Sequence, residues 1–318
     1  MAHLGKARVF GEDNNYAQAL RYAELALTKL KLLKDRPLDA LDAALACKTV
    51  SLGFMGRHSE AMENAQERYT LWAMTDIRNP SSIWAAFDLI QCCLQIGEFT
   101  DAELYALTAL EIINERTDNI IPLDQQQHTL ARGSALLAQA TQALAQAGGI
   151  APEAKQEAGV KSIALARNAL EINTQLFGTE HDDVAHSMDL LASVLQSFND
   201  IDDDEVLRLY EQAIAIYVTL YGSSHMTVGS CEDNLGLAYS NRAKRAYNAH
   251  DLDRELTNLQ LALTHNREAA RIYTDINQAE SAANALRDVA FVEEKIRHVR
   301  TRIAAEAAGA APVGASRR

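Results

Sequence analysis

Two stretches of the chain share a glycine followed three residues later by a histidine, a pattern that could serve metal binding or catalysis. They read LFGTEHDDVAHSMDLLASVL at residues 176–195 and LYGSSHMTVGSCEDNLGLAY at residues 220–239. Two zinc-binding histidines on one helix must lie four residues apart. His186 lies five residues from His181, off that face, so this spacing does not favour a metal site.

The same stretches also suit a turn between two helices. Gly178 and Gly222 would stand just past a helix end, where a left-handed backbone is favoured and glycine adopts it without strain. His181 and His225 would then enter the next helix and cap or pack the turn. We favour this interpretation, in which each copy closes one helix pair and opens the next.

A second candidate is the acidic stretch DIDDDEVLRLYE at residues 200–211. Its acids occupy the first, third, fifth and twelfth positions of a calcium-binding loop. Glu205 takes the sixth position, where such a loop needs glycine for its sharp turn. We therefore interpret the stretch as the acidic start of a helix, which the helix dipole favours.

Common catalytic and cofactor motifs are absent from the sequence. It has no nucleotide-binding glycine loop, nucleophile elbow, HExxH or paired CxxC. Its cysteines are scattered without metal-ligand spacing, at Cys47, Cys92, Cys93 and Cys231. They suit a reducing compartment and small buried positions. We expect no enzyme, no cofactor and no metal site.

The composition indicates a helical protein. The chain of 318 residues is 48% hydrophobic, with only five prolines and fifteen glycines, and helix-forming residues dominate. Its net charge of −13 disfavours nucleic acid as a ligand. Neither a long apolar run nor a signal-peptide core is present, so we expect no membrane association and a cytoplasmic location.

Four prolines predict helix starts, because proline is tolerated in a first helical turn but disfavours helix just before it. Pro37, Pro80, Pro122 and Pro152 each precede a run with apolar residues at spacings of three and four. The helices between them form pairs, with short breaks near residues 56–58, 97–99 and 198–200.

The second helix of several pairs carries small residues where its partner must approach closely: Ala61, Ala65, Ala102, Ala106, Ala213 and Ala215. About five such pairs recur with a period near 40 residues, which predicts a stacked array. Extra residues fall at 142–157 and 242–253, as longer helices or longer connections.

The pairs resemble tetratricopeptide repeats in their pattern of a small residue, Leu, Gly-x-Phe/Tyr and acidic-Ala. ALEINTQLFGTEHDDVAHSMDLLASVL and AIAIYVTLYGSSHMTVGSCEDNLGLAY are similar to the longer repeat of kinesin light chains. This resemblance covers about residues 165–240, and the blocks at 38–76 and 81–117 match the generic repeat. It implies an all-α, right-handed superhelical solenoid.

The resemblance also implies a partner-binding groove, because the first helices of such repeats line the concave face. There, two neighbouring asparagines per repeat can bond the backbone of a partner segment. The matching positions hold Asp189 and Leu190 in one repeat, Asp233 and Asn234 in the next, and Asp88 upstream. Carboxylates in place of most amides favour partners that contain Lys or Arg.

We expect four parts in the chain: a partial N-terminal repeat at 1–34, the repeat array at 35–276, a capping helix at 277–308 and a flexible tail at 309–318. Because the first part begins inside a repeat, we expect the chain to be a fragment of a longer protein or to descend from one.

The favoured function is a scaffold or adaptor that binds a protein or peptide segment in the concave groove. Two alternatives stay open. One is the non-catalytic repeat region of a larger enzyme or zinc-containing regulatory protein. The other is a self-assembling structural protein, joined through its N-terminal end or its basic C-terminal helix. The sequence leaves the partner and the oligomeric state undetermined.

Overall fold

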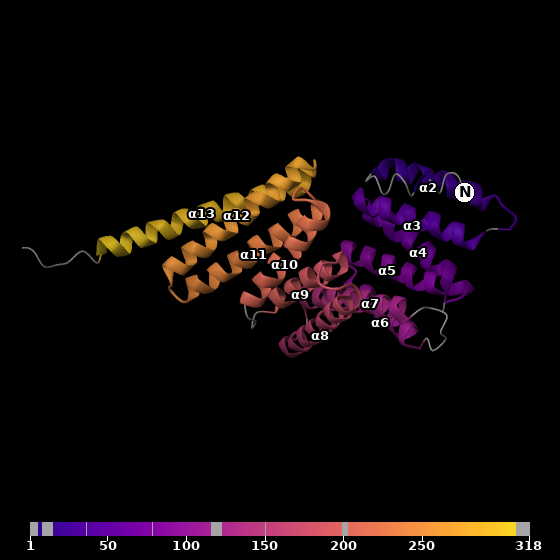
Figure 1. Cartoon of the computed structure of the whole chain (residues 1–318), viewed down its shortest axis with the longest axis horizontal. Coiled ribbons are helices and arrows are strands. Elements are labelled where there is room, and N and C mark those ends of the chain that lie inside the picture. Colours follow the sequence, from indigo (N-terminus) through magenta and orange to yellow (C-terminus); the bar gives the residue numbers. More distant parts are fainter. Residues whose placement is uncertain are drawn as a thin grey trace, which may run out of the picture. The chain divides into compact units, whose positions relative to one another are not determined.

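The protein is helical throughout the part that the structure describes. The computed structural model describes residues 6–7, 15–35, 37–77, 79–115, 123–149, 151–198 and 203–309. Within these ranges there is no strand, and helices follow one another along the chain (Figure 1). The prediction of an all-α fold is confirmed.

The chain divides into two compact units, Met1–Ile172 and Asn173–Arg318. The boundary falls within helix α8 (Pro152–Phe177), so the last residues of this helix belong to the second unit.

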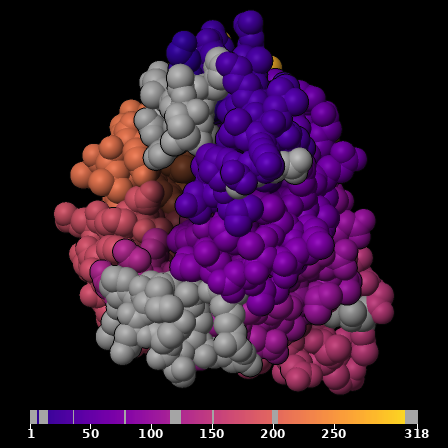
Figure 2. Space-filling model, turned by 90° about the vertical axis from the view of Figure 1, so that its right-hand side faces the viewer, coloured from indigo at the N-terminus to yellow at the C-terminus, as the bar shows by residue number. Residues whose placement is uncertain are grey.

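In the first unit, each helix packs against the next one in the chain. In the order of the chain the helices are α2 (Tyr16–Lys31), α3 (Leu38–Phe54), α4 (His58–Thr75), α5 (Pro80–Ile96), α6 (Phe99–Glu115) and α7 (Leu123–Gln146). The first helices of successive pairs, α3, α5 and α7, also touch their neighbours in that row. Figure 2 shows the surface of this unit graded from indigo to purple in chain order, as a stack of repeats requires.

The core of the first unit depends on small residues in the second helices. Ala61, Ala65, Ala102 and Ala106 are fully buried, as their spacing predicts. They let α4 and α6 approach α5, whose Leu89 is also fully buried. Close packing of this kind makes the core sensitive to a change of even one methylene group.

The second unit continues the pattern with longer helices. They are α9 (Asp182–Ser197), α10 (Asp203–Tyr221), α11 (Met226–Asn248), α12 (Leu252–Asp275) and α13 (Ala279–Gly309). α11 and α12 have 23 and 24 residues, so the extra residues predicted at 242–253 mainly lengthen these helices. The extra residues at 142–157 likewise fall mainly in α7 and α8, with 24 and 26 residues.

Helix α13 closes the second unit along one narrow seam. Ala282, Ala285, Val292, Ile296 and Val299 are buried, and α13 packs on α12. Their spacings of three, seven, four and three residues are those of a coiled-coil seam. Outside this seam most of the described side chains of α13 are exposed, and its last described residue is Gly309.

One packing prediction is wrong. Ala215 on α10 is exposed, whereas Ala213 is fully buried. Two residues along a helix turn the side chain by about 200°, so Ala213 and Ala215 cannot share a face. The buried side of α10 instead follows Val206, Tyr210, Ala213 and Tyr217 at helical spacing.

The predicted helix starts agree with the structure where it describes them. Pro37 immediately precedes α3, while Pro80 and Pro152 are the first residues of α5 and α8. Pro122 lies outside the described residues, and α7 begins at Leu123.

Candidate interaction surface

The repeated histidines are helix caps. His181 precedes α9, and its Nδ1 accepts the backbone N–H of Asp183 at 3.2 Å. Its ring stacks on Phe177 with centroids 4.3 Å apart. His225 does the same before α11, accepting from the N–H of Thr227 and stacking on Tyr221 at 4.6 Å. The capping prediction is confirmed for both copies.

The preceding glycines make the turns possible. Gly178 and Gly222 have φ angles of 79° and 85°, in the left-handed region that residues with a Cβ rarely adopt. Each lies directly after the last residue of a helix, α8 or α10. In each copy, glycine therefore ends one helix, and the histidine caps the N-terminus of the next helix while its ring stacks on an aromatic side chain.

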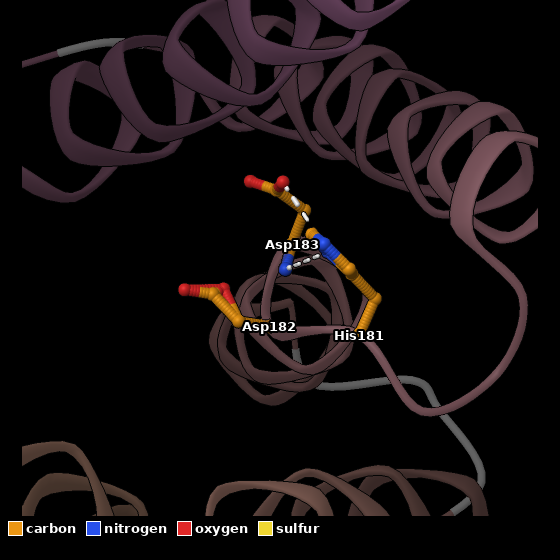
Figure 3. Close-up of side chains that lie close together, drawn as sticks. All are labelled: His181, Asp182 and Asp183. Carbon is orange, nitrogen blue, oxygen red and sulfur yellow. Dashed lines mark hydrogen bonds and ion pairs between the residues drawn. The ribbon is translucent and has the colours of Figure 1, made fainter. Parts of the chain in front are cut away.

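His181 also belongs to a group with Asp182 and Asp183, whose potential metal-ligating atoms all lie within 4.8 Å of one another. Figure 3 shows His181 and Asp183 turned toward each other, while Asp182 extends in another direction. Asp182 accepts the hydroxyl of Tyr221 at 2.6 Å. The cap and this hydrogen bond account for the proximity of the three side chains.

The acidic stretch at 200–211 is helical from Asp203 onward, where α10 begins. Residues 200–202 lie outside the described part. The sixth to twelfth positions of the candidate calcium loop are therefore regular helix, as the interpretation of a helix start predicts.

In the first unit, Asp88 on α5 is held by a buried arginine. Arg68 on α4 is only 6% exposed; it binds Asp88 at 2.5 Å and Asp42 on α3 at 2.7 Å. Trp72 Nε1 donates to the same Asp42 carboxylate at 2.7 Å. Burial raises the pKa of Asp88, and the charges of Arg68 and Arg132 oppose that rise. Much of the negative charge of Asp88 is thus balanced within the protein.

In the second unit, Asp189 on α9 and Asn234 on α11 are hydrogen-bonded to each other. The Asn234 amide donates to Asp189 Oδ1 at 3.2 Å and links two successive first helices. Burial raises the pKa of Asp189, while hydrogen bonds from Asn234 and Cys231 oppose the rise. The two predicted residues are brought together, and each satisfies part of the other's bonding capacity.

Asp233 on α11 is the exception among the predicted residues. Among the described residues, its carboxylate has no hydrogen bond or ion pair. Burial raises the pKa of Asp233, and the charge of Asp288 on α13 raises it further. Asp288 likewise has no ion-pair partner in the described part of the chain.

The sequence reasoning missed Asp288, because it treated α13 only as a cap with a solvated face. The spacing of the buried residues of α13 is the sequence signal that could have identified Asp288. Asp288 lies three residues after Ala285 and four before Val292, at the edge of that seam, where it can reach the neighbouring first helix.

The cysteines have the surroundings of structural residues. Burial raises the pKa of Cys92 to about 12 and that of Cys93 to about 11, which leaves little reactive thiolate. Over the described residues, no helix combines the length and apolar character that a membrane crossing needs.

Comparisons with known proteins agree with this geometry. The tetratricopeptide repeat profile matches residues 184–225, from the first turn of α9 to the capping histidine of α11. A search of curated proteins finds no match.

Two Rap structures resemble most of this chain in fold. Apo RapI has 14% identity and a TM-score of 0.57, covering 93% of this chain and 98% of that one. A Rap protein complexed with Competence and Sporulation Factor has 11% identity and a TM-score of 0.56, covering 93% and 75%.

The TPR-like repeats of a Podosopora anserina protein assigned to the kinesin light chains are also similar, with 17% identity and a TM-score of 0.49 over 69% of this chain and 94% of that one. The Rap likeness establishes the fold of this chain, and the profile match establishes the repeat type at 184–225. The chain therefore has an all-α repeat fold, with a tetratricopeptide repeat at residues 184–225.

Proposed function

We propose that this chain is a scaffold that binds a segment of a protein partner against the first helices of the second unit, α9 and α11. The first helices of the first unit, α3, α5 and α7, offer a second surface of the same kind. The observation that carries the proposal is Asp233, a partly buried carboxylate on α11 that has no ion pair among the described residues. The like charge of Asp288 on α13 disfavours its ionised form further. Leaving a buried charge unpaired is costly, so such a position favours an external basic group.

The other predicted contacts would contribute differently. Asp88 is engaged by Arg68, and Asp189 is bonded to Asn234. These carboxylates keep further acceptor capacity for a partner's N–H groups, but little uncompensated charge. In this proposal Asp189 and Asn234 position the partner backbone on the second unit, and Asp233 selects for Lys or Arg. Asp88 offers an acceptor on the surface of the first unit.

The type of protein supports binding rather than catalysis. Repeat arrays present extended, pre-organised surfaces, which reduce the entropic cost of holding a partner. One neighbour of similar fold was solved in complex with Competence and Sporulation Factor. We infer a polypeptide partner for this chain, because its acidic charge disfavours nucleic acid and its sequence lacks catalytic motifs.

Site-specific photocrosslinking in a lysate of the source organism tests which face binds. A photoreactive residue would replace Gln91 on α5 or Leu237 on α11, both exposed on first helices. Matched controls replace Leu107 on α6 or Leu261 on α12, which are exposed on second helices. We expect a discrete crosslinked partner from the first-helix positions alone. The same products from both faces, or products from second helices only, would reject the proposal.

A further inference from the structure

Helices α11 and α13 both pack on α12 and run parallel to each other in a defined register. Each packs on α12 and is joined to it by a short turn, at residues 249–251 and 276–278 (Figure 1). Asp288 acts electrostatically on Asp233, and the Arg302 guanidinium lies 4.8 Å from the Tyr247 ring centroid. The residue numbers differ by 55 in both pairs, so the two helices keep the same register over 14 residues.

Two large apolar side chains lie at matching heights on α11 and α13, between the Asp233–Asp288 pair and the Tyr247–Arg302 pair. Leu237 on α11 is 54% exposed, and Phe291 on α13 is 57% exposed. Their numbers differ by 54, which places them within about one residue, roughly 1.5 Å, of the same height. Leu237 lies one helical turn beyond Asp233, and Phe291 lies three residues beyond Asp288, so each apolar residue shares a face with its carboxylate.

These side chains form what we call the α11–α13 strip: Asp233, Leu237, Tyr247, Asp288, Phe291 and Lys295. Its beginning carries two carboxylates that repel each other, and its middle carries exposed apolar surface. Lys295 lies 5.2 Å from the Phe291 ring centroid, and Arg302, already bonded to Glu255, lies beyond it. The strip is therefore acidic at one end, apolar in the middle and basic at the other.

Asp233 lacks the compensation that other buried or partly buried carboxylates of this chain have, while Asp288, at the same height on α13, is exposed. Asp88 is paired with Arg68, Glu255 with Arg302, and Glu232 with His265. Between Asp233 and Asp288, a cation from outside would meet two acceptors at once. A guanidinium can bond both because it offers several donors in a planar fork.

We propose that the α11–α13 strip binds a partner segment in which an Arg or Lys enters between Asp233 and Asp288 and an apolar side chain rests on Leu237 and Phe291. The proposal rests on the proposed function and specifies its partner. One helical turn on α11 covers about 6 Å. The two partner residues are therefore two apart in an extended segment, or three or four apart in a helical one.

A random-peptide phage library selected against the full chain tests this proposal. Enriched peptides would be synthesised, and their Kd measured by fluorescence anisotropy. Three proteins are compared: the unchanged chain, Asp233→Asn/Asp288→Asn, and Leu237→Ala/Phe291→Ala. The control is Asp253→Asn/Glu294→Gln, which removes the same charge from exposed positions in the same unit. Circular dichroism melting confirms that each variant is folded.

We expect enriched peptides to contain a basic residue and an apolar residue at one of these spacings. Each strip variant should raise Kd about tenfold or more, and the control should leave Kd within about twofold. Enriched peptides that lack the basic residue, or binding that neither strip variant weakens, would overturn the proposed role of the α11–α13 strip. Either result would leave the proposed scaffold function intact. A selection that enriches no peptide would count against both.

Discussion

Arg68 on α4 binds Asp88 on α5 at 2.5 Å, and the same guanidinium binds Asp42 on α3 at 2.7 Å. One buried cation thus ties three helices of the first unit together. Because Arg68 and its partners carry little solvent exposure, the network is sensitive to the loss of any member.

Replacement of Arg68 should therefore be severely destabilising. Arg68→Ala leaves two partly buried carboxylates without their cation, and we expect a loss of about 3–5 kcal/mol in the free energy of unfolding. Urea denaturation followed by circular dichroism measures it. The matched control is Arg57→Ala, which removes an exposed arginine paired with Glu60. Equal losses in both variants would show that the buried network contributes no special stability.

Gly236 should not tolerate a side chain. A Cβ at this position would lie 1.7 Å from Asn266 Oδ1 and 3.4 Å from the backbone oxygen of Ala262. Asn266 is only 4% exposed and has little room to move. Gly236→Ala should cost about 1–3 kcal/mol of unfolding free energy.

The control for this change is Gly53→Ala on α3, where the added Cβ meets only Gln95 Oε1, at 3.8 Å. That variant should be neutral or stabilising by about 0.5–1 kcal/mol, since alanine is the better helix former. Adding Asn266→Ala to Gly236→Ala should recover part of the loss. Thermal melting that shows no difference between Gly236→Ala and Gly53→Ala would contradict the close approach of α11 and α12.

The stability that a capping histidine provides can be separated into two contributions, one from the cap acceptor and one from the stacked ring. His225→Ala removes both the cap acceptor and the ring that stacks on Tyr221, so we expect a loss of about 0.5–2 kcal/mol. His225→Asn restores a cap acceptor without the ring and should lose less. Urea denaturation of both variants tests this order, and a larger loss with asparagine would show that the cap is unimportant.

Asp233 should make the protein less stable as pH rises. Its pKa is raised in the folded state, so the folded chain holds this proton more tightly than the unfolded chain does. The stability that protonation provides is fully present below the ordinary aspartate pKa and is lost as pH rises through the raised value. At neutral pH, Asp233→Asn should therefore increase the free energy of unfolding.

Urea denaturation at mildly acidic and at neutral pH measures this dependence. The gain from Asp233→Asn should be larger at neutral pH than at acidic pH. Glu294→Gln, a change at an exposed carboxylate on α13, provides the control. A gain from Asp233→Asn that is equal at both pH values would exclude an unfavourable charge at this position.

Local features of this fold were predictable because short-range physics determines them. Proline and glycine restrict the backbone wherever they occur, so the starts of α3, α5 and α8 and the turns at Gly178 and Gly222 follow from the sequence. The capping role of His181 also depends only on residues close to it in the chain. Ala215 does not share the buried face with Ala213, because two residues along a helix turn the side chain by about 200°.

Only the tertiary structure decided which charges are balanced. Asp88 and Asp233 look alike in the sequence, as acids at matching positions of first helices. Asp88 forms an ion pair with Arg68, twenty residues away in the chain, whereas the charge of Asp288, fifty-five residues away, disfavours the ionised form of Asp233. Periodicity predicts which face of a helix is buried, but not which side chain of another helix will stand opposite. The sequence alone determined a helical repeat protein, and the packing of its helices decided which carboxylates have a cation beside them among the described residues.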